Sequence, residues 1–175
     1  MIFAYADPPY IGQAKKHYDS EEVDHKELLR ELTGGLYGGW ALSCSSPSLQ
    51  EILALCPTDV RVGAWVKPFC SFKANVNPAY AWGPVIFWGG KKRTREQPTM
   101  RDWVSENITL KRGLSGAKPD KFSFWVFSCL GAGEGDRLID MFPGTGAVEQ
   151  AWDIYRDKQE ECEETVMLYG PKAKR

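Results

Sequence analysis

Residues 1–10 read MIFAYADPPY, in which six apolar residues stop abruptly at Asp7-Pro8-Pro9-Tyr10. An apolar run without polar alternation is typical of a strand buried on both faces, as in a parallel sheet. The two prolines fix φ and remove two backbone donors, so the turn after this strand is stiff and presents carbonyl oxygens. The Asp7 carboxylate adds acceptors and the Tyr10 ring adds a flat face, which together suit the amino group of a planar base. The alternative interpretation is a proline-rich turn that Asp7 merely caps.

Strand and helix patterns alternate along the chain after this turn. Apolar runs predict further strands at residues 40–44, 60–66, 84–88 and 137–142. Capping residues predict helices that begin after Asp24 and after Ser46, the second with Pro47 at its first position. Such alternation indicates an α/β fold with crossover helices. We expect one domain over residues 1–175, with 89–117 as a long loop.

A second motif, Asp140-Met141-Phe142-Pro143-Gly144-Thr145-Gly146, lies between a predicted strand and a predicted helix. Glycines at such a point let the backbone pass close to a ligand, and the helix N-terminus favours polar or anionic groups. A short G-x-G is weak evidence alone, because many turns contain glycine. A P-loop is excluded because no G-K-[ST] follows.

The composition excludes several classes of protein. Of the 175 residues, 43% are hydrophobic and 26% are charged, which excludes a disordered or collagen-like chain. The net charge of −1 argues against a protein that coats nucleic acid without specificity. Five cysteines without a C-x-x-C pair, and only two histidines, His17 and His25, give poor support for a metal site or a disulfide framework. No apolar run is long enough to cross a membrane and the N-terminus lacks a basic signal region, so we expect no membrane partner and a cytoplasmic location.

Together the two motifs resemble those of the amino-group DNA methyltransferases, whose hallmarks are a D-P-P-Y turn and a D-x-F-x-G-x-G loop for S-adenosyl-L-methionine. The order, with the diproline turn first, is similar to the permuted arrangement of that family's β group. Residues 80–87, YAWGPVIF, are similar to its Y-x-W-E-P-v-l-v segment, with Gly83 in place of the usual glutamate. Lys118-Pro119 is similar to its K-P segment. The resemblance implies a Rossmann-like methyltransferase fold with a reduced sheet, whose second and third core strands are short or missing.

The resemblance also implies roles for individual residues. Asp7 and the Pro8 carbonyl would accept hydrogen bonds from the exocyclic amino group of a base flipped out of duplex DNA, and Tyr10 would stack on that base. The implied catalytic residues are Asp7, Pro8, Pro9 and Tyr10. The implied residues for S-adenosyl-L-methionine are Asp7, Lys118, Pro119, Asp140, Phe142, Gly144 and Gly146. Aspartate before Pro-Pro favours adenine N6 over cytosine N4 as the acceptor within the family.

Several features depart from the family or stay open. Only 165–169 is left for a next core strand, and no acid follows it to hold the cofactor's ribose, so Asp153 or an acid within 160–164 is the substitute we expect. The 89–117 loop is the candidate for reading DNA, and its basic residues are either phosphate contacts or a solvated surface: Lys91, Lys92, Arg93 and Arg95. Residues 15–22 are a candidate lid over the base. The tryptophans are expected in the core: Trp65, Trp82, Trp88, Trp125 and Trp152.

The leading hypothesis is therefore a small DNA adenine-N6 methyltransferase of a bacterium or phage. Its small size favours a homodimer, since one copy has little surface with which to enclose a duplex. The alternatives are transfer to cytosine N4 or to RNA, and a catalytically silent methyltransferase-like module that binds nucleic acid or a partner.

Overall fold

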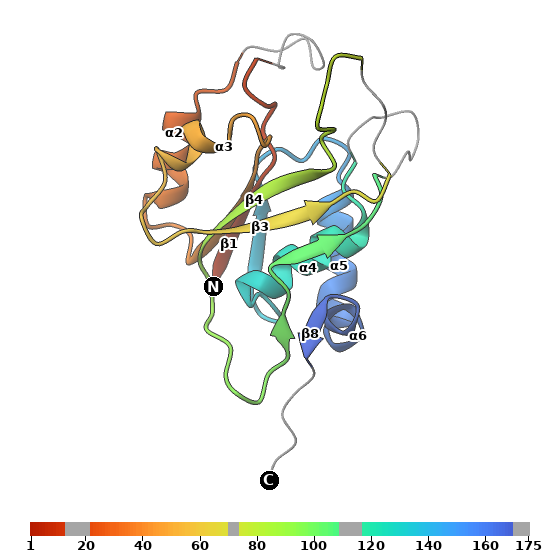
Figure 1. Cartoon of the computed structure of the whole chain (residues 1–175). Helices are drawn as coiled ribbons and strands as arrows, with labels where there is room; N and C mark the ends of the chain where they lie inside the picture. Colours follow the sequence, from red (N-terminus) through yellow and green to blue (C-terminus); the bar gives the residue numbers. More distant parts are fainter. Residues whose placement is uncertain (13–21, 70–73, 109–116, 170–175) are drawn as a thin grey trace.

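The computed structural model describes residues 1–12, 22–69, 74–108 and 117–169. The candidate lid at 15–22 lies, apart from Glu22, outside the described residues. The main sheet has six strands in the order β6-β3-β4-β2-β1-β7 (Figure 1). Its strands are β1 (Ile2–Ala6), β2 (Gly39–Ser43), β3 (Arg61–Val66), β4 (Trp82–Gly89), β6 (Trp103–Ser105) and β7 (Arg137–Asp140).

The sheet is mixed, with β4 as the reversed strand. The strand β1 runs parallel to both β2 and β7, and β3 runs parallel to β6. The strand β4 lies antiparallel to β2 and to β3. The carboxyl ends of β1, β2, β3, β6 and β7 therefore share one edge of the sheet, and β4 begins there. We call this the carboxyl edge; Gly89, at the end of β4, lies at the opposite edge.

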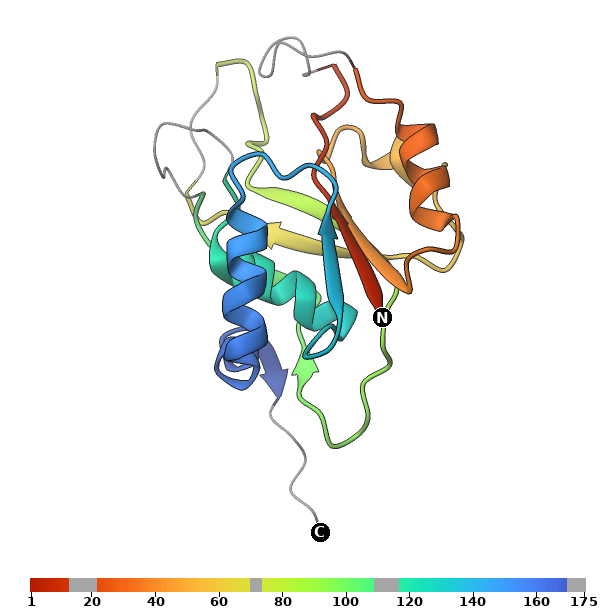
Figure 2. The same cartoon turned by 180° about the vertical axis from the view of Figure 1, so that it is seen from behind.

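Helices cover both faces of the sheet. The helices α2 (His25–Thr33) and α3 (Leu49–Leu53) lie on one face, and α4 (Asp120–Leu130) and α5 (Ala147–Asp157) lie on the other (Figures 1 and 2). Phe3 and Tyr5 of β1 pack on the α4 side, while Ala4 and Ala6 pack on the α2 side. All four are at most 1% exposed, which confirms the prediction of a strand buried on both faces.

Helix boundaries follow the capping residues in one case and differ in another. Asp24 caps α2, because its side chain accepts hydrogen bonds from the backbone N–H groups of Lys26 and Glu27. The helix α3 begins only at Leu49, so the expected start after Ser46 is wrong. The hydroxyls of Ser45 and Ser48 lie 2.6 Å apart, and the backbone N–H of Ser48 donates to the carbonyl of Ser45, so a turn precedes the helix.

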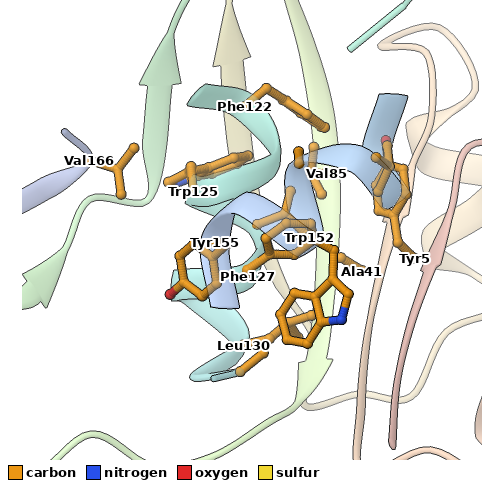
Figure 3. Packing of buried hydrophobic residues seen from close by; sticks show 14 of the residues in the cluster. Tyr5, Ala41, Val85, Phe122, Trp125, Phe127, Leu130, Trp152, Tyr155 and Val166 are labelled. Carbon is orange, nitrogen blue, oxygen red and sulfur yellow. The ribbon is translucent and has the colours of Figure 1, made fainter. Parts of the chain in front are cut away.

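Aromatic rings fill the core between the sheet and the helices α4 and α5 (Figure 3). Phe127 meets Trp152 edge-on at 5.1 Å between ring centroids and meets Tyr155 at 5.3 Å. Trp125 meets Phe87 of β4 at 5.2 Å in the same way. Aromatic pairs of this geometry add about 0.5–1.5 kcal/mol each beyond area burial. Trp65, Trp125 and Trp152 are buried as expected, whereas Trp82 is 39% exposed, so its expected place in the core is wrong.

Residues 89–108 contain strands where a long loop was expected, and 109–116 lie outside the described residues. These strands are β5 (Thr99–Met100) and β6, and β6 extends the main sheet beside β3. After α5 the chain forms α6 (Gln159–Glu164) and β8 (Met167–Tyr169), and β8 pairs antiparallel with β5 in a separate small sheet. Residues 167–169, in the run that is left for a next core strand, therefore pair outside the main sheet, in line with the prediction that the second and third core strands are short or missing. Among the described residues, β7 ends the main sheet, as expected for a reduced core. None of the described helices has the length and apolar character of a membrane span.

Candidate active site

The two motifs meet at the carboxyl edge of the sheet. Tyr5 of β1 lies opposite Asp140 of β7 in the parallel register. The backbone N–H of Met141 donates to the carbonyl oxygen of Tyr5 over 2.9 Å, so the pairing continues just past the last residue of β7. The Asp7-to-Tyr10 turn and the Asp140-to-Gly146 loop therefore leave adjacent strands at the same point. The expectation that the diproline corner and the glycine loop come together is confirmed.

Asp7 is held by a lysine that lies 111 residues further along the chain. The Lys118 ammonium donates to Oδ2 of Asp7 in an ion pair. The Lys118 side chain is 7% exposed and that of Asp7 is 25% exposed. Pro119 then caps α4 in an extended conformation, which brings Lys118 back over the end of β1. The K-P segment therefore lies beside the diproline turn, and Lys118 fixes one oxygen of the Asp7 carboxylate.

The Lys118 ammonium also lies on aromatic rings. It is 5.5 Å from the ring centroid of Trp65 and 5.8 Å from that of Phe122. Cation–π contacts of this kind stabilise a desolvated ammonium by about 2 kcal/mol or more. A buried lysine needs such partners because burial alone disfavours its charged form. Lys118 is thus positioned by Asp7 and by two rings together.

The glycine loop depends on two residues with positive φ. Gly144 has φ 47° and Gly146 has φ 71°, a conformation that L side chains rarely adopt. The N–H of Gly146 donates to the carbonyl of Pro143 over 2.7 Å, and α5 begins at the next residue. No atom lies closer than 3.8 Å to a Cβ built at either glycine. The glycines are therefore required by the backbone turn rather than by packing, because a Cβ at either position would meet only ordinary van der Waals contacts and no clash.

Asp140 has a perturbed pKa. Burial raises the pKa of Asp140 to about 6, and the negative charges of Asp7 and Glu149 add to the increase. The backbone N–H of Phe142 donates to its Oδ1 over 3.1 Å and lowers the pKa in part, as does Lys118. A positive charge placed against this carboxylate would favour its ionised form and lower its pKa.

Tyr5, which lies close to the candidate site, was not singled out from the sequence. The hydroxyl of Tyr5 lies 2.9 Å from Oγ of Ser43, and both side chains are buried. Burial first, and then the charge of Asp7, raise the pKa of Tyr5 well above its usual value, so this phenol stays neutral. Tyr5 lies two residues before Asp7, and side chains two residues apart along a strand share a face. This spacing could have indicated that Tyr5 lies near the site. Tyr5 and Ser43 are thus a buried, hydrogen-bonded pair near the carboxyl ends of β1 and β2.

The residues predicted to contact DNA lie away from the two motifs. Gly90 donates its N–H to the carbonyl of Gly38, and Lys91 donates its own to that of Leu130, at the edge opposite the carboxyl edge. The Lys91 ammonium lies 2.5 Å from Asp136 Oδ2, in an ion pair. Arg93 is likewise engaged inside the molecule, with Glu163 and with the carbonyl of Ser128. The proposed site therefore does not include the four basic residues of this segment: Lys91, Lys92, Arg93 and Arg95.

The acids expected to hold a ribose are also placed elsewhere. Asp153 is exposed on α5 and pairs with Arg156 at 2.6 Å. Glu163 of α6 is buried against Arg93, and β8 follows it into the small sheet. Of the predicted site residues, the structure brings together the Asp7-to-Tyr10 turn, Lys118-Pro119 and the Asp140-to-Gly146 loop.

This arrangement is that of the Rossmann-like methyltransferase fold, with the reduced sheet expected for it. A crystal structure described as the M1.HpyAVI–SAM complex is similar, with a TM-score of 0.60 over 93% of this chain and 85% of that chain. The two sequences are 13% identical, so the likeness concerns the fold. A scan against protein-family models finds no match, and a search of curated protein sequences finds no significant one.

Proposed function

We propose that this chain is an S-adenosyl-L-methionine-dependent DNA methyltransferase that methylates the exocyclic N6 of adenine. The observation that carries the proposal is the meeting of the Asp7-to-Tyr10 turn with the Asp140-to-Gly146 loop at one edge of the sheet. The similar solved structure is named as a complex with SAM, which supports the choice of cofactor.

The residues at the edge fit this cofactor chemically. Its methionine part carries an ammonium group, and Asp140 is a partly buried carboxylate whose pKa is raised mainly by burial, so an added positive charge would favour its ionised form. The loop from Phe142 to Gly146 has no side chain beyond Cα at its two positive-φ glycines, so a ligand can approach the backbone there closely. We assign Asp140, Phe142, Gly144 and Gly146 to the cofactor, with Lys118-Pro119 and Asp7 beside it. When bound, the cofactor supplies an electrophilic methyl group on a sulfonium.

The protein's own contribution is positioning. The N6 lone pair of adenine is delocalised into the ring, so N6 is a poor nucleophile. Asp7 and the Pro8 carbonyl hold its two N–H bonds, which favours a pyramidal nitrogen whose lone pair points at the methyl carbon. Asp7 keeps one oxygen on Lys118, so its other oxygen has a fixed direction for N6–H. As the methyl group moves from sulfur to N6, the sulfur would leave as the neutral thioether, and the Asp7 carboxylate would accept the proton that N6 gives up.

The flipped base needs a stacking partner to offset its extrusion, which costs a few kcal/mol. Tyr10 follows the two prolines directly, so its ring is carried by a stiff turn. Stacking on an aromatic side chain contributes about 1–3 kcal/mol per base. Pro9 keeps the distance between the Pro8 carbonyl and the Tyr10 ring constant.

A methyl-transfer assay tests the proposal directly. Purified protein with tritiated S-adenosyl-L-methionine and unmethylated DNA is expected to label the DNA, and mass spectrometry of the digested nucleosides is expected to show N6-methyladenine. Asp7→Asn is the matched control, because it keeps the size of the side chain while one acceptor becomes a donor. Labelled N4-methylcytosine or labelled RNA would favour the corresponding alternative.

The silent-module alternative has its own outcome. Calorimetric titration with S-adenosylhomocysteine is expected to give a micromolar dissociation constant if the cofactor loop functions. Absence of binding, together with absence of label in any nucleic acid, would refute the enzyme and favour a methyltransferase-like binding module.

A further inference from the structure

A second lysine lies near the candidate site on the same face of the sheet. Lys67 follows the end of β3, and its backbone N–H donates to the carbonyl of Ala81 over 2.8 Å. Its ammonium folds back over Trp65, 4.7 Å from the ring centroid. That is the ring against which the Lys118 ammonium lies, at 5.5 Å. Two cations therefore gather on one indole next to Asp7.

A glycine opposite Trp65 lies close to the Lys67 ammonium. Gly83 of β4 pairs with Trp65 across the antiparallel ladder. A Cβ built at Gly83 would lie 3.7 Å from the Lys67 ammonium, which is the one atom found within 4 Å of it. A glutamate at this position, as in the resembling family, would place its carboxylate against Lys67. Glycine adds no charge there, so the local field around Lys67 is more positive than a glutamate would leave it.

The strand order places Lys67 and the cofactor loop on opposite sides of β1. The cofactor loop follows β7, on one side of β1, whereas Lys67 follows β3, on the other side of β1 beyond β2 and β4. Asp7, at the end of β1, lies between them, at the point where amino group and methyl group meet in the proposed reaction. Because the cofactor loop lies on the β7 side of Asp7, the β3 side with Lys67 is the side left for the nucleotide, whose backbone phosphate is the anion it brings.

The surroundings of Lys67 support a nucleotide rather than a second part of the cofactor. A hollow of about 300 Å³ beside it is lined by Ser46, Asn75, Asn77, Tyr80 and Trp82 among others. Tyr80 is 52% exposed and Phe69 is 73% exposed, so this end of the β3–β4 hairpin presents aromatic faces to solvent. Exposed rings beside a cation are the usual components of a surface for unstacked nucleotides.

We propose that Lys67 binds the backbone phosphate next to the flipped base, and that Gly83 preserves this function by adding no carboxylate beside the ammonium. The inference rests on the proposed function and assigns the nucleotide side of the same site. Lys67 is a binding residue in this role and takes no part in bond making.

The test uses a short duplex with one adenine opposite an abasic site, because such a base is easily extruded. Lys67→Ala is expected to weaken binding of this duplex about tenfold and to make the slope of log affinity against log salt shallower by about 0.9. Replacing the phosphate beside that adenine by a neutral methylphosphonate is expected to weaken binding by the unaltered protein to the same extent. The methylphosphonate should then have no further effect on Lys67→Ala.

Gly83 provides a test that leaves the lysine in place. Gly83→Glu is expected to reproduce the loss caused by Lys67→Ala, and to add little in the Lys67→Ala background. Gly83→Gln is the matched control of the same size without charge, and is expected to bind normally. Lys158→Ala, an exposed lysine at the far end of α5, is the control for loss of a general positive charge. Thermal unfolding of each variant checks that the fold is retained.

The outcomes separate this inference from the proposed function. If the unaltered protein neither binds nor methylates DNA, the proposed function fails and this inference fails with it. If the unaltered protein methylates DNA but Lys67→Ala keeps its affinity and salt slope, Lys67 has no phosphate role and the inference alone is overturned. Loss of S-adenosylhomocysteine affinity in Lys67→Ala would also overturn it, because Lys67 would then serve the cofactor.

Discussion

The backbone N–H of Met141 lies 2.9 Å from the carbonyl oxygen of Tyr5, and this hydrogen bond joins the two ends of the candidate site. The residues are 136 positions apart, yet each lies within two residues of the aspartate that begins its motif. Parallel pairing of β1 with β7 thus sets the spacing between Asp7 and Asp140 through the backbone. Changes to Asp7, Lys118, Asp140 and Gly146 should therefore alter stability, cofactor affinity or both.

The ion pair between Asp7 and Lys118 should show an asymmetric effect on stability. Asp7→Ala leaves the Lys118 ammonium, 7% exposed, without its carboxylate, and is expected to lower the free energy of unfolding by about 2 kcal/mol. The double variant Asp7→Ala/Lys118→Met removes the buried charge as well and is expected to recover most of this loss. Urea unfolding measures both. Equal destabilisation of single and double variants would contradict a buried charge pair.

Asp140 should make the ligand-free protein less stable as pH rises. Its folded-state pKa, about 6, is above the unfolded value, so the cost of ionising it appears between about pH 4 and pH 6 and is complete above that range. Asp140→Asn is expected to stabilise the ligand-free protein at about pH 7.5 by no more than about 3 kcal/mol, with no gain below about pH 4. Urea unfolding across this pH range is the measurement.

The same titration should govern cofactor affinity in the opposite sense. Affinity for S-adenosylhomocysteine is expected to fall about tenfold per pH unit below about pH 6, because the protonated Asp140 no longer attracts the ammonium. Asp140→Asn should bind weakly at every pH. A pH-independent affinity in the unaltered protein would show that Asp140 does not hold the methionine part.

The loop glycines should matter for conformation rather than for packing. Gly146→Ala forces a Cβ into φ 71° and is expected to cost about 1 kcal/mol of stability together with a loss of cofactor affinity. Gly135 is a matched control, because it has φ 77° and no atom within 4 Å of a built Cβ, and it lies before β7. Gly135→Ala should cost similar stability and leave calorimetric binding of S-adenosylhomocysteine unchanged.

Arg93 should prove to be a structural residue. Its guanidinium contacts both carboxylate oxygens of Glu163, at 3.0 and 3.2 Å, and donates to the carbonyl of Ser128 at 2.8 Å. Burial alone would raise the pKa of Glu163, but hydrogen bonds from Arg93, Gln159 and Tyr155 hold it below its usual value. Arg93→Ala is expected to lower stability by about 2–3 kcal/mol, with a salt slope of DNA binding equal to that of the unaltered protein.

Arg95→Ala is the control for this variant, since Arg95 is exposed on the same segment. It should change stability by less than about 0.5 kcal/mol. A shallower salt slope in either variant would restore the interpretation of this segment as a DNA contact.

The sequence by itself determined several strands, the cap of α2 and the composition of the two motifs in the candidate site. The apolar run of β1 identified a strand buried on both faces, and the residues after it and after β7 identified two turns with the composition of a ligand site. These features are local, since burial patterns, proline geometry and glycine turns are read within a few residues. The order of the segments was sufficient for the resemblance that indicated the fold.

The tertiary structure decided which of the charged residues belong to the site. A count of lysines and arginines places Lys91 and Arg93 in a basic segment, but only the reversed direction of β4 carries that segment to the edge opposite Asp7. The same reversal brings Lys67 and Gly83 to the carboxyl edge, where the sequence showed merely an isolated lysine and a missing glutamate. Strand order and direction are set by the sum of long-range packing over the whole core, and for that reason no short stretch of sequence specifies them.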